Sequence, residues 1–113
     1  MNARMSDAGK VRLVALDGRI VWGGACEELT DLVKKLLSEG HDRIVLDLTG
    51  VTQMDSGGVG AMATCRQRAL AKDAGIVLVI PATSKIPMVV QTCLALMFKT
   101  FRDEKSAIGS FAK

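Results

Sequence analysis

The pattern of apolar and polar positions predicts a mixed α/β fold. Apolar residues run almost without a break through two short stretches, 44–48 and 76–80, as in central strands that are covered on both faces. Elsewhere they recur every three or four positions, which is typical of helices with one buried face. The predicted strands are residues 11–16, 19–22, 44–48, 76–80 and 98–101. The predicted helices are residues 27–38, 58–72, a segment capped by Thr83 or Ser84, and 103–111.

Each predicted helix has a defined inner face. The expected inward residues are Leu29, Leu32, Val33, Leu36 and Leu37; Val59, Met62, Ala63, Ala69 and Leu70; Ile86, Val89, Val90 and Leu94; and Ala107, Ile108 and Phe111. Arg66 falls within the second stripe, so either its long side chain reaches solvent or the buried face of this helix is narrower than the stripe. Pro87 is tolerable in the first turn of its helix.

Turn signals set the order of these elements. Asp17-Gly18 predicts a hairpin between the first two strands, and Gly23-Gly24 ends the second. A polar bend is expected from Thr49 to Asp55, between the central strand and the next helix. Residues 1–8 are predicted to be a flexible tail, which leaves 9–113 as a single domain. The prediction is a mixed, mainly parallel sheet with covering helices and an N-terminal antiparallel hairpin.

Composition supports one globular domain. The chain has 113 residues, of which 49% are hydrophobic and 24% charged. No apolar run approaches the roughly 20 residues that span a bilayer, and the first residues lack the apolar core of a signal peptide. We therefore expect a cytoplasmic protein with no direct membrane insertion. The net charge of +3, scattered basic residues and 4% aromatics argue against a nucleic-acid partner.

The residues that usually hold metals are few. Cys26, Cys65 and Cys93 form no C-x-x-C pair, and His41 is the single histidine. No zinc-ligand spacing can be assembled from them, so neither a metal nor a cofactor is expected. The three cysteines are predicted to be buried, reduced thiols, and His41 a solvent-exposed turn residue.

The most informative segment is Asp55-Ser56-Gly57-Gly58, directly before a predicted helix. It places a carboxylate, a hydroxyl and two flexible glycines at a helix N-terminus. Unpaired backbone N–H groups there favour an anion, such as a phosphate carried by Ser56 or brought by a partner.

An enzyme is less consistent with the sequence than a binding protein. Residues 58–63 fit G-x-G-x-x-A, a variant of the dinucleotide fingerprint, so nucleotide binding at the Gly57-Gly58 helix end is a third hypothesis. Six residues separate the strand from Asp55 where a tight turn is expected, and no acid follows the next strand. Gly58 and Gly60 instead suit close helix–sheet packing. No nucleophilic triad can be built, and Asp47 suits a strand residue held by backbone hydrogen bonds.

Two further features leave alternatives open. Trp22, the single tryptophan, is either a core plug over one end of the sheet or an exposed anchor. Most of the six methionines suit core filling, while Met54 and Met62 could instead form an apolar rim for a partner.

At Asp55-Ser56-Gly57-Gly58-Val59-Gly60 the chain resembles STAS domains, the fold of bacterial anti-sigma-factor antagonists. The family pattern is a strand and then Asp-Ser-Ser/Thr-Gly-Leu/Ile-Gly at a helix start. The resemblance covers nearly residues 10–112 and includes four other segments. These are 17–20, 45–51, 75–79 and 98–107.

The resemblance implies a protein without catalysis that binds an anti-sigma factor of the serine-kinase type and so releases a sigma factor. It implies that the kinase phosphorylates the second hydroxyl position of the motif and that a phosphatase reverses this. The implied partner-binding residues are Asp55, Ser56, Gly57, Gly58, Val59, Gly60 and Ala61.

The chain departs from the family pattern at one position. The usual phosphoacceptor position is Gly57, which cannot be phosphorylated. Either Ser56 is a shifted acceptor, or the protein is unswitched and acts as a permanently competent antagonist or as a STAS subunit of a stress-signalling scaffold or lipid-transport complex. The sequence does not predict an oligomeric state.

Overall fold

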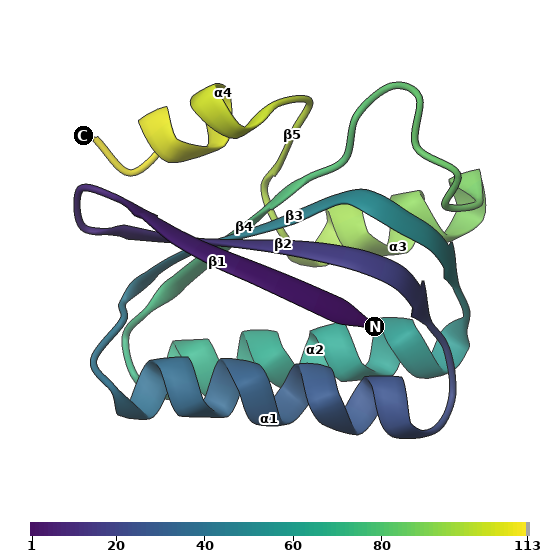
Figure 1. Cartoon of the computed structure of the whole chain (residues 1–113), viewed down its shortest axis with the longest axis horizontal. Coiled ribbons are helices and arrows are strands. Elements are labelled where there is room, and N and C mark those ends of the chain that lie inside the picture. Colours follow the sequence, from purple (N-terminus) through teal and green to yellow (C-terminus); the bar gives the residue numbers. More distant parts are fainter. Residues whose placement is uncertain (113) are drawn as a thin grey trace.

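A computed structural model describes residues 1–112 (Figure 1). Within them the strands are β1 (Asn2–Ala8), β2 (Val11–Ile20), β3 (Arg43–Met54), β4 (Gly75–Val79) and β5 (Thr100–Phe101). The helices are α1 (Gly24–Ser38), α2 (Ser56–Ala71), α3 (Met88–Met97) and α4 (Glu104–Gly109). The strands form one sheet in the order β1-β2-β3-β4-β5. β1 is antiparallel to β2 and the other neighbours are parallel, so the predicted mixed sheet is confirmed.

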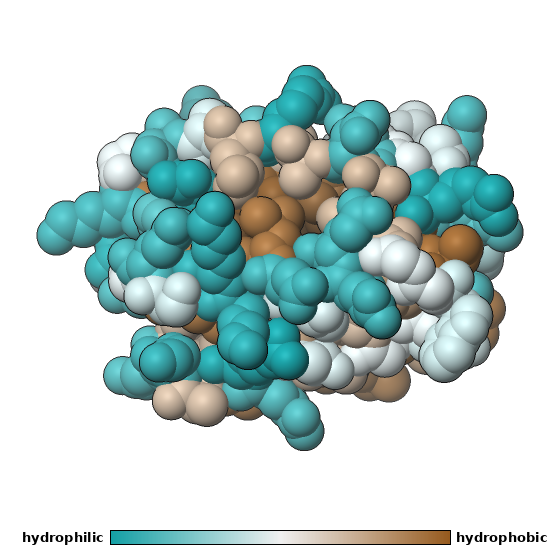
Figure 2. All heavy atoms as spheres, turned by 60° about the horizontal axis from the view of Figure 1, so that its bottom comes forward, coloured by the Kyte–Doolittle hydropathy of each residue, from teal (hydrophilic) through white to brown (hydrophobic). Residues whose placement is uncertain are grey.

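Two layers of helices cover the sheet (Figure 1). One face packs on α1, α2 and α3 through the main apolar core, which includes Leu36, Leu46, Met62, Leu78 and Leu94. The other face carries a smaller cluster of valines that packs on Ala107 of α4. Figure 2 looks onto the α1 and α2 side, where hydrophilic side chains cross the surface and apolar ones show between them. Among residues 1–112, no helix is long and apolar enough to cross a membrane.

The prediction of a flexible tail at residues 1–8 was wrong. Residues 2–8 are strand β1, which pairs with β2 from Asn2↔Asp17 to Ala8↔Val11. The residues of β1 are mostly exposed at the sheet edge, so they carry no apolar alternation that could reveal a strand. Backbone pairing and the ion pair between Arg4 and Asp17, at 3.2 Å, hold β1 in place instead.

The hairpin turn also lies elsewhere than predicted. The chain reverses at Gly9-Lys10, where Gly9 has φ 61°, and Asp17-Gly18 lies inside the continuous strand β2. Gly18, with φ 95°, lies at one of two register shifts between β2 and β3. Such irregularities bend a strand without ending it, and glycine accepts the positive φ at low cost. Residues 19–22 therefore form no separate returning strand.

β3 is longer than its apolar run. It extends to Met54, because its second half pairs with β2 as far as Ile20↔Met54. The predicted polar bend from Thr49 to Asp55 is therefore wrong for all but its last residue. Pairing with a neighbouring strand outweighed the weak local strand preference of these polar residues.

The helices follow the predicted positions with some corrections. α3 begins at Met88 with Pro87 as the N-cap, and Ser84 accepts a hydrogen bond from the Ile86 N–H in the turn before it. Val89 and Leu70, both predicted to face inward, are exposed. Arg66 is also exposed, and its Nε donates to the Met97 carbonyl at 2.8 Å, which ties α2 to the end of α3.

Candidate functional site

The candidate surface lies at the end of the sheet that the carboxyl ends of strands β2 and β3 form. Because these strands are parallel, the segments that follow Ile20 and Met54 leave the sheet side by side. The segment after β2 leads into α1 and the segment after β3 leads into α2 (Figure 1). Trp22 lies in the first of these segments and Asp55 in the second. The first turns of both helices therefore meet at one end of the molecule.

Asp55 joins these two segments. Its Oδ1 accepts a hydrogen bond from the Gly58 N–H at 3.0 Å and so caps α2. Both carboxylate oxygens also lie near the Trp22 N–H, at 3.1 and 3.2 Å. The hydrogen bonds from Trp22 and then Gly58 lower the pKa of Asp55, because they favour the ionised carboxylate. The predicted anion seat is thus already filled by the protein's own carboxylate.

The two glycines after Ser56 sit close to β2 and the segment that follows it. A Cβ atom on Gly58 would overlap the Ile20 carbonyl oxygen and stand 2.6 Å from Met54 Cγ. A Cβ atom on Gly57 would lie 3.0 Å from Trp22 Cα and 3.1 Å from Asp55 Oδ1. Gly58 is therefore required for packing, and the usual acceptor position at Gly57 is crowded by the Trp22 backbone. Gly60, in contrast, faces open space, so its predicted packing role was wrong.

An open hollow lies between the first turns of α1 and α2. Its volume is about 460 Å³ and its exposed lining is mostly apolar. It is lined by Trp22, Cys26, Glu27, Thr30, Ser56, Gly57, Gly60 and Ala61. The Trp22 side chain is 84% exposed, so it is an anchor at the surface rather than a plug in the core. An exposed tryptophan beside a concave apolar surface is typical of a binding interface.

The charge at this end is acidic. Glu27, Glu28 and Asp31 lie in the first half of α1, and Asp55 caps α2. Residues 20–33 and 44–65 contain no lysine or arginine. The surface thus offers an apolar hollow beside carboxylates, which suits a partner segment that carries an apolar side chain and basic residues.

The comparison with protein families decides what this chain is. The STAS domain model matches residues 3–107, which is nearly the whole chain. The chain belongs to the STAS domain family. The match begins within β1, so β1 is part of the domain rather than a tail before it.

Solved structures share the fold of this STAS domain. The unphosphorylated anti-sigma factor antagonist SpoIIAA aligns with 17% identity over 98% of each chain and a TM-score of 0.75. An anti-sigma factor antagonist from Mycobacterium paratuberculosis aligns with 19% identity over 99% of this chain and 94% of that one, with a TM-score of 0.76. The phosphorylated form of Bacillus SpoIIAA aligns with 17% identity over 96% and 98%, with a TM-score of 0.69. No curated protein sequence matches the chain.

The predicted binding residues of the STAS domain do not all reach the surface. Ser56 and Gly60 are exposed, and Asp55, Gly57 and Val59 are half-buried. Gly58 and Ala61 are buried, although Ala61 lines the hollow. Sequence reasoning left the role of Trp22 open and did not assign Thr30 or Glu27 to the surface. Their position beside Asp55 depends on the parallel pairing of β2 and β3. Met54 and Met62 are core residues, so they form no rim.

The cysteines of the STAS domain differ from the prediction of three buried thiols. Cys65 is buried, and burial raises the pKa of its thiol to about 12. Cys26 is half-buried, with a pKa that is raised by burial and by the nearby Asp55, and its Sγ donates to the Val21 carbonyl at 3.2 Å. Cys93 is exposed. Within residues 1–112, no group of three or more metal-ligating side chains is placed to hold an ion.

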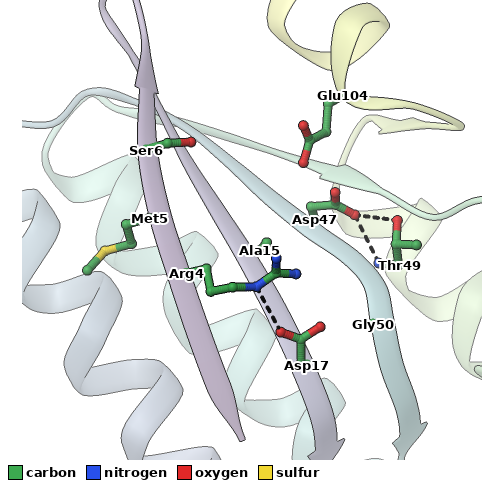
Figure 3. A pocket seen from close by; sticks show the side chains of 9 residues that line it. All are labelled: Arg4, Met5, Ser6, Ala15, Asp17, Asp47, Thr49, Gly50 and Glu104. Atoms are coloured by element: carbon green, nitrogen blue, oxygen red, sulfur yellow. Dashed lines mark hydrogen bonds and ion pairs between the residues drawn. The ribbon is translucent and has the colours of Figure 1, made fainter.

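A second hollow lies on the opposite face of the STAS domain, between the sheet and α4 (Figure 3). Its volume is about 400 Å³, and Asp17, Asp47 and Glu104 bring carboxylates to it. Asp47 is buried in β3 and accepts hydrogen bonds from the N–H and hydroxyl of Thr49, as a strand residue held by local hydrogen bonds would. The pKa of Glu104 is raised, first by its hydrogen bond with Asp47 and then by burial. Asp17 pairs with Arg4 and Asp47 with Thr49, so these two carboxylates already have partners within the domain and their role is structural.

Proposed function

We propose that this STAS domain binds an anti-sigma factor of the serine-kinase type and so releases a sigma factor, which makes it a regulator of transcription without catalysis of its own. The binding surface is the Trp22–Asp55 end of the molecule. The observation that carries the proposal is the exposed Trp22 beside the apolar hollow, held against the α2 cap by the Asp55 carboxylate. The resemblance to anti-sigma-factor antagonists supplies the partner class.

The physical basis of binding is an anchored, preorganised surface. Three backbone features fix it before a partner arrives: the cap on Gly58, the Trp22 tether and the close approach of Gly58 to Ile20. A surface that is already ordered loses little conformational entropy on binding, so more of the contact energy appears as affinity. Trp22 fits the role of the residue that contributes most of that energy.

The same geometry bears on regulation by phosphorylation. SpoIIAA has been solved in phosphorylated and unphosphorylated forms, which supports a phosphate switch in that relative. In this chain Gly57 cannot accept a phosphate, and the Trp22 backbone leaves little room for a side chain there. Ser56 is exposed at the first residue of α2 and remains the phosphorylation candidate, with a phosphatase as the matching second partner.

One observation favours the second candidate function, a non-switching STAS subunit of a stress-signalling scaffold or lipid-transport complex. That observation is Gly57, because a subunit that stays bound needs no acceptor hydroxyl. Incubation with the kinase and ATP, followed by mass spectrometry, distinguishes a phosphorylated antagonist from an unswitched protein. Phosphate on Ser56 supports the switched antagonist, and tight binding without phosphate supports an unswitched protein.

Titration calorimetry with a purified serine-kinase anti-sigma factor encoded in the same genome tests the main proposal. We expect binding that weakens at least about tenfold in Trp22→Ala, since exposed tryptophan anchors often carry about 2 kcal/mol or more. Gly60→Gln, which fills the hollow, should weaken binding similarly. Leu70→Gln removes another exposed apolar side chain of α2 that is not part of the hollow lining, and it should leave the affinity unchanged.

Two results would contradict the proposal. One is the absence of binding to any such kinase, with recovery of transporter or scaffold subunits instead. The other is tight binding that survives both Trp22→Ala and Gly60→Gln, since the partner would then use a different surface. Circular dichroism confirms that each variant is folded before its affinity is compared.

A further inference from the structure

The outer face of α3 is apolar and uncovered within residues 1–112. Met88, Val89 and Leu96 are exposed by 72%, 71% and 83%. Thr92 and Cys93 are also exposed, and side chains four positions apart stack on one side of a helix. Met88, Thr92 and Leu96 therefore form one row and Val89 and Cys93 the adjacent row. We name these five residues the α3 face.

The opposite side of α3 packs against the main core. Leu94 is buried, and Val90 and Met97 pack against the main core beside α2. One apolar side of α3 thus packs on the core, and a second apolar side faces outward. A helix that only stabilised the fold would carry polar residues there, and contiguous exposed apolar residues usually mark an interaction surface.

Basic residues surround the α3 face. α3 itself carries no charge, Lys85 precedes it, and Lys99 and Arg102 follow it. The Arg66 guanidinium reaches the carbonyl of Met97 at the end of the helix, and Arg102 lines a small hollow with Met88 and Thr92. The basic residues near α3 are thus Arg66, Lys85, Lys99 and Arg102, and residues 74–102 contain no acidic residue. The occupant of this face is therefore expected to be apolar and negatively charged.

We propose that the α3 face adsorbs to an anionic membrane surface. The helix would lie parallel to the bilayer with Met88, Val89 and Leu96 in the headgroup layer and the flanking cations against acidic lipids. This is peripheral adsorption, distinct from the membrane insertion that the sequence argues against, and it is independent of the proposed partner binding at Trp22.

Two arguments favour a membrane over a protein partner. α3 has ten residues and is about 15 Å long, so one of its faces falls short of the roughly 800 Å² per partner of a stable protein interface. A lipid surface adds long-range attraction to that small contact and needs no matching groove. A second copy packed antiparallel would bring Lys85 of one chain near Lys99 of the other, and these like charges repel.

Vesicle flotation of the full chain tests the proposal. The vesicles are phosphatidylcholine alone, or phosphatidylcholine with about one third phosphatidylglycerol, at about 0.15 M salt. We expect flotation with the anionic vesicles, little with phosphatidylcholine alone, and a loss at high salt. The triple variant Met88→Gln/Val89→Thr/Leu96→Gln should reduce bound protein at least about tenfold, as should Lys85→Gln/Lys99→Gln.

Matched variants control for general loss of apolar or basic surface. Leu70→Gln removes an exposed leucine from α2, and Lys34→Gln/Lys35→Gln removes two exposed lysines from α1. Both should float like the unaltered chain. Because every replaced side chain is exposed, circular dichroism should show the same fold for all variants.

The outcomes are decisive in either direction. Anionic-lipid binding that both α3 variants abolish establishes the membrane surface. No flotation with anionic vesicles, or flotation that the triple variant leaves unchanged, overturns it. Concentration-dependent dimerisation in analytical ultracentrifugation that the triple variant abolishes would assign the face to a second copy and would also overturn the proposal.

Discussion

The carboxylate of Asp55 accepts a hydrogen bond from the backbone N–H of Trp22, which lies 33 positions earlier in the chain. This contact joins the segment that leaves β2 to the cap of α2, and with it the two halves of the candidate surface. Stability and binding at this end therefore depend on the same side chain.

Asp55→Ala should lower the urea midpoint of unfolding at pH 7, because the Trp22 and Gly58 N–H groups lose their acceptor. The pKa of Asp55 is lowered from 3.8 in the folded protein. Its contribution is therefore fully present above pH 3.8 and is lost as the pH falls through the folded pKa. The difference between variant and unaltered chain should shrink in that acidic range. Asp31→Ala, at an exposed position of α1, is the control.

Gly58→Ala and Gly60→Ala should have opposite effects. The added methyl of Gly58→Ala would overlap the Ile20 carbonyl and crowd Met54, so we expect a loss of about 1–3 kcal/mol in the free energy of unfolding. The methyl of Gly60→Ala meets open space in a helix interior, so we expect a gain of about 0.5–1 kcal/mol. Urea unfolding measures both. Equal effects of the two substitutions would contradict the packing described at this end.

Glu104→Gln should change how stability depends on pH. The pKa of Glu104 is raised from 4.5 by its hydrogen bond with Asp47 and by burial. The stabilisation is therefore fully present below pH 4.5 and is lost as the pH rises through the folded pKa. An amide keeps a donor at every pH, so the variant should lose less stability than the unaltered chain between pH 5 and neutrality. Glu28→Gln in α1 is the control, and identical pH profiles for all three proteins would contradict the contact.

The three thiols should react at different rates with a thiol reagent such as dithionitrobenzoate. Cys93 is exposed and should react first, and Cys26 should follow because burial and Asp55 raise its pKa. Cys65, with a pKa raised to about 12 by burial, should react only when the protein unfolds. Mass spectrometry of the labelled peptides at successive times gives the order. Early labelling of Cys65 would show that the α2 packing opens in the native state.

Elements with strong local signals were predicted well from the sequence. The apolar runs of β3 and β4 and the stripe of α1 are long enough to reveal their own secondary structure. Asp103 illustrates a local signal as well, since it caps α4 by accepting from the Ser106 N–H at 2.8 Å. These features depend on neighbouring residues only, so propensity and periodicity suffice to find them.

Elements whose structure depends on distant partners were not predicted. β1 is polar and exposed, and it is a strand because β2 offers a pairing edge. Asp17-Gly18 carries a hairpin signal, yet parallel pairing with β3 continues β2 through it as a bent but unbroken strand. Val89 fits the inner stripe of a helix, but the orientation of α3 on α2 turns it outward. In each case tertiary contacts outweighed a local preference.

The features of the candidate site also fall into those that the sequence predicted and those that depend on distant contacts. The STAS fold and the missing hydroxyl at Gly57 could be predicted from the sequence, because the family's motifs occur in order along the chain and position 57 is a glycine. Only the folded structure shows that Asp55 itself caps α2, that Trp22 lies against that cap, that the Trp22 backbone crowds position 57 and that the outer side of α3 is uncovered. The last three of these facts follow from the register between β2 and β3 and from helix packing, which join residues far apart in the chain and leave no mark in its local pattern.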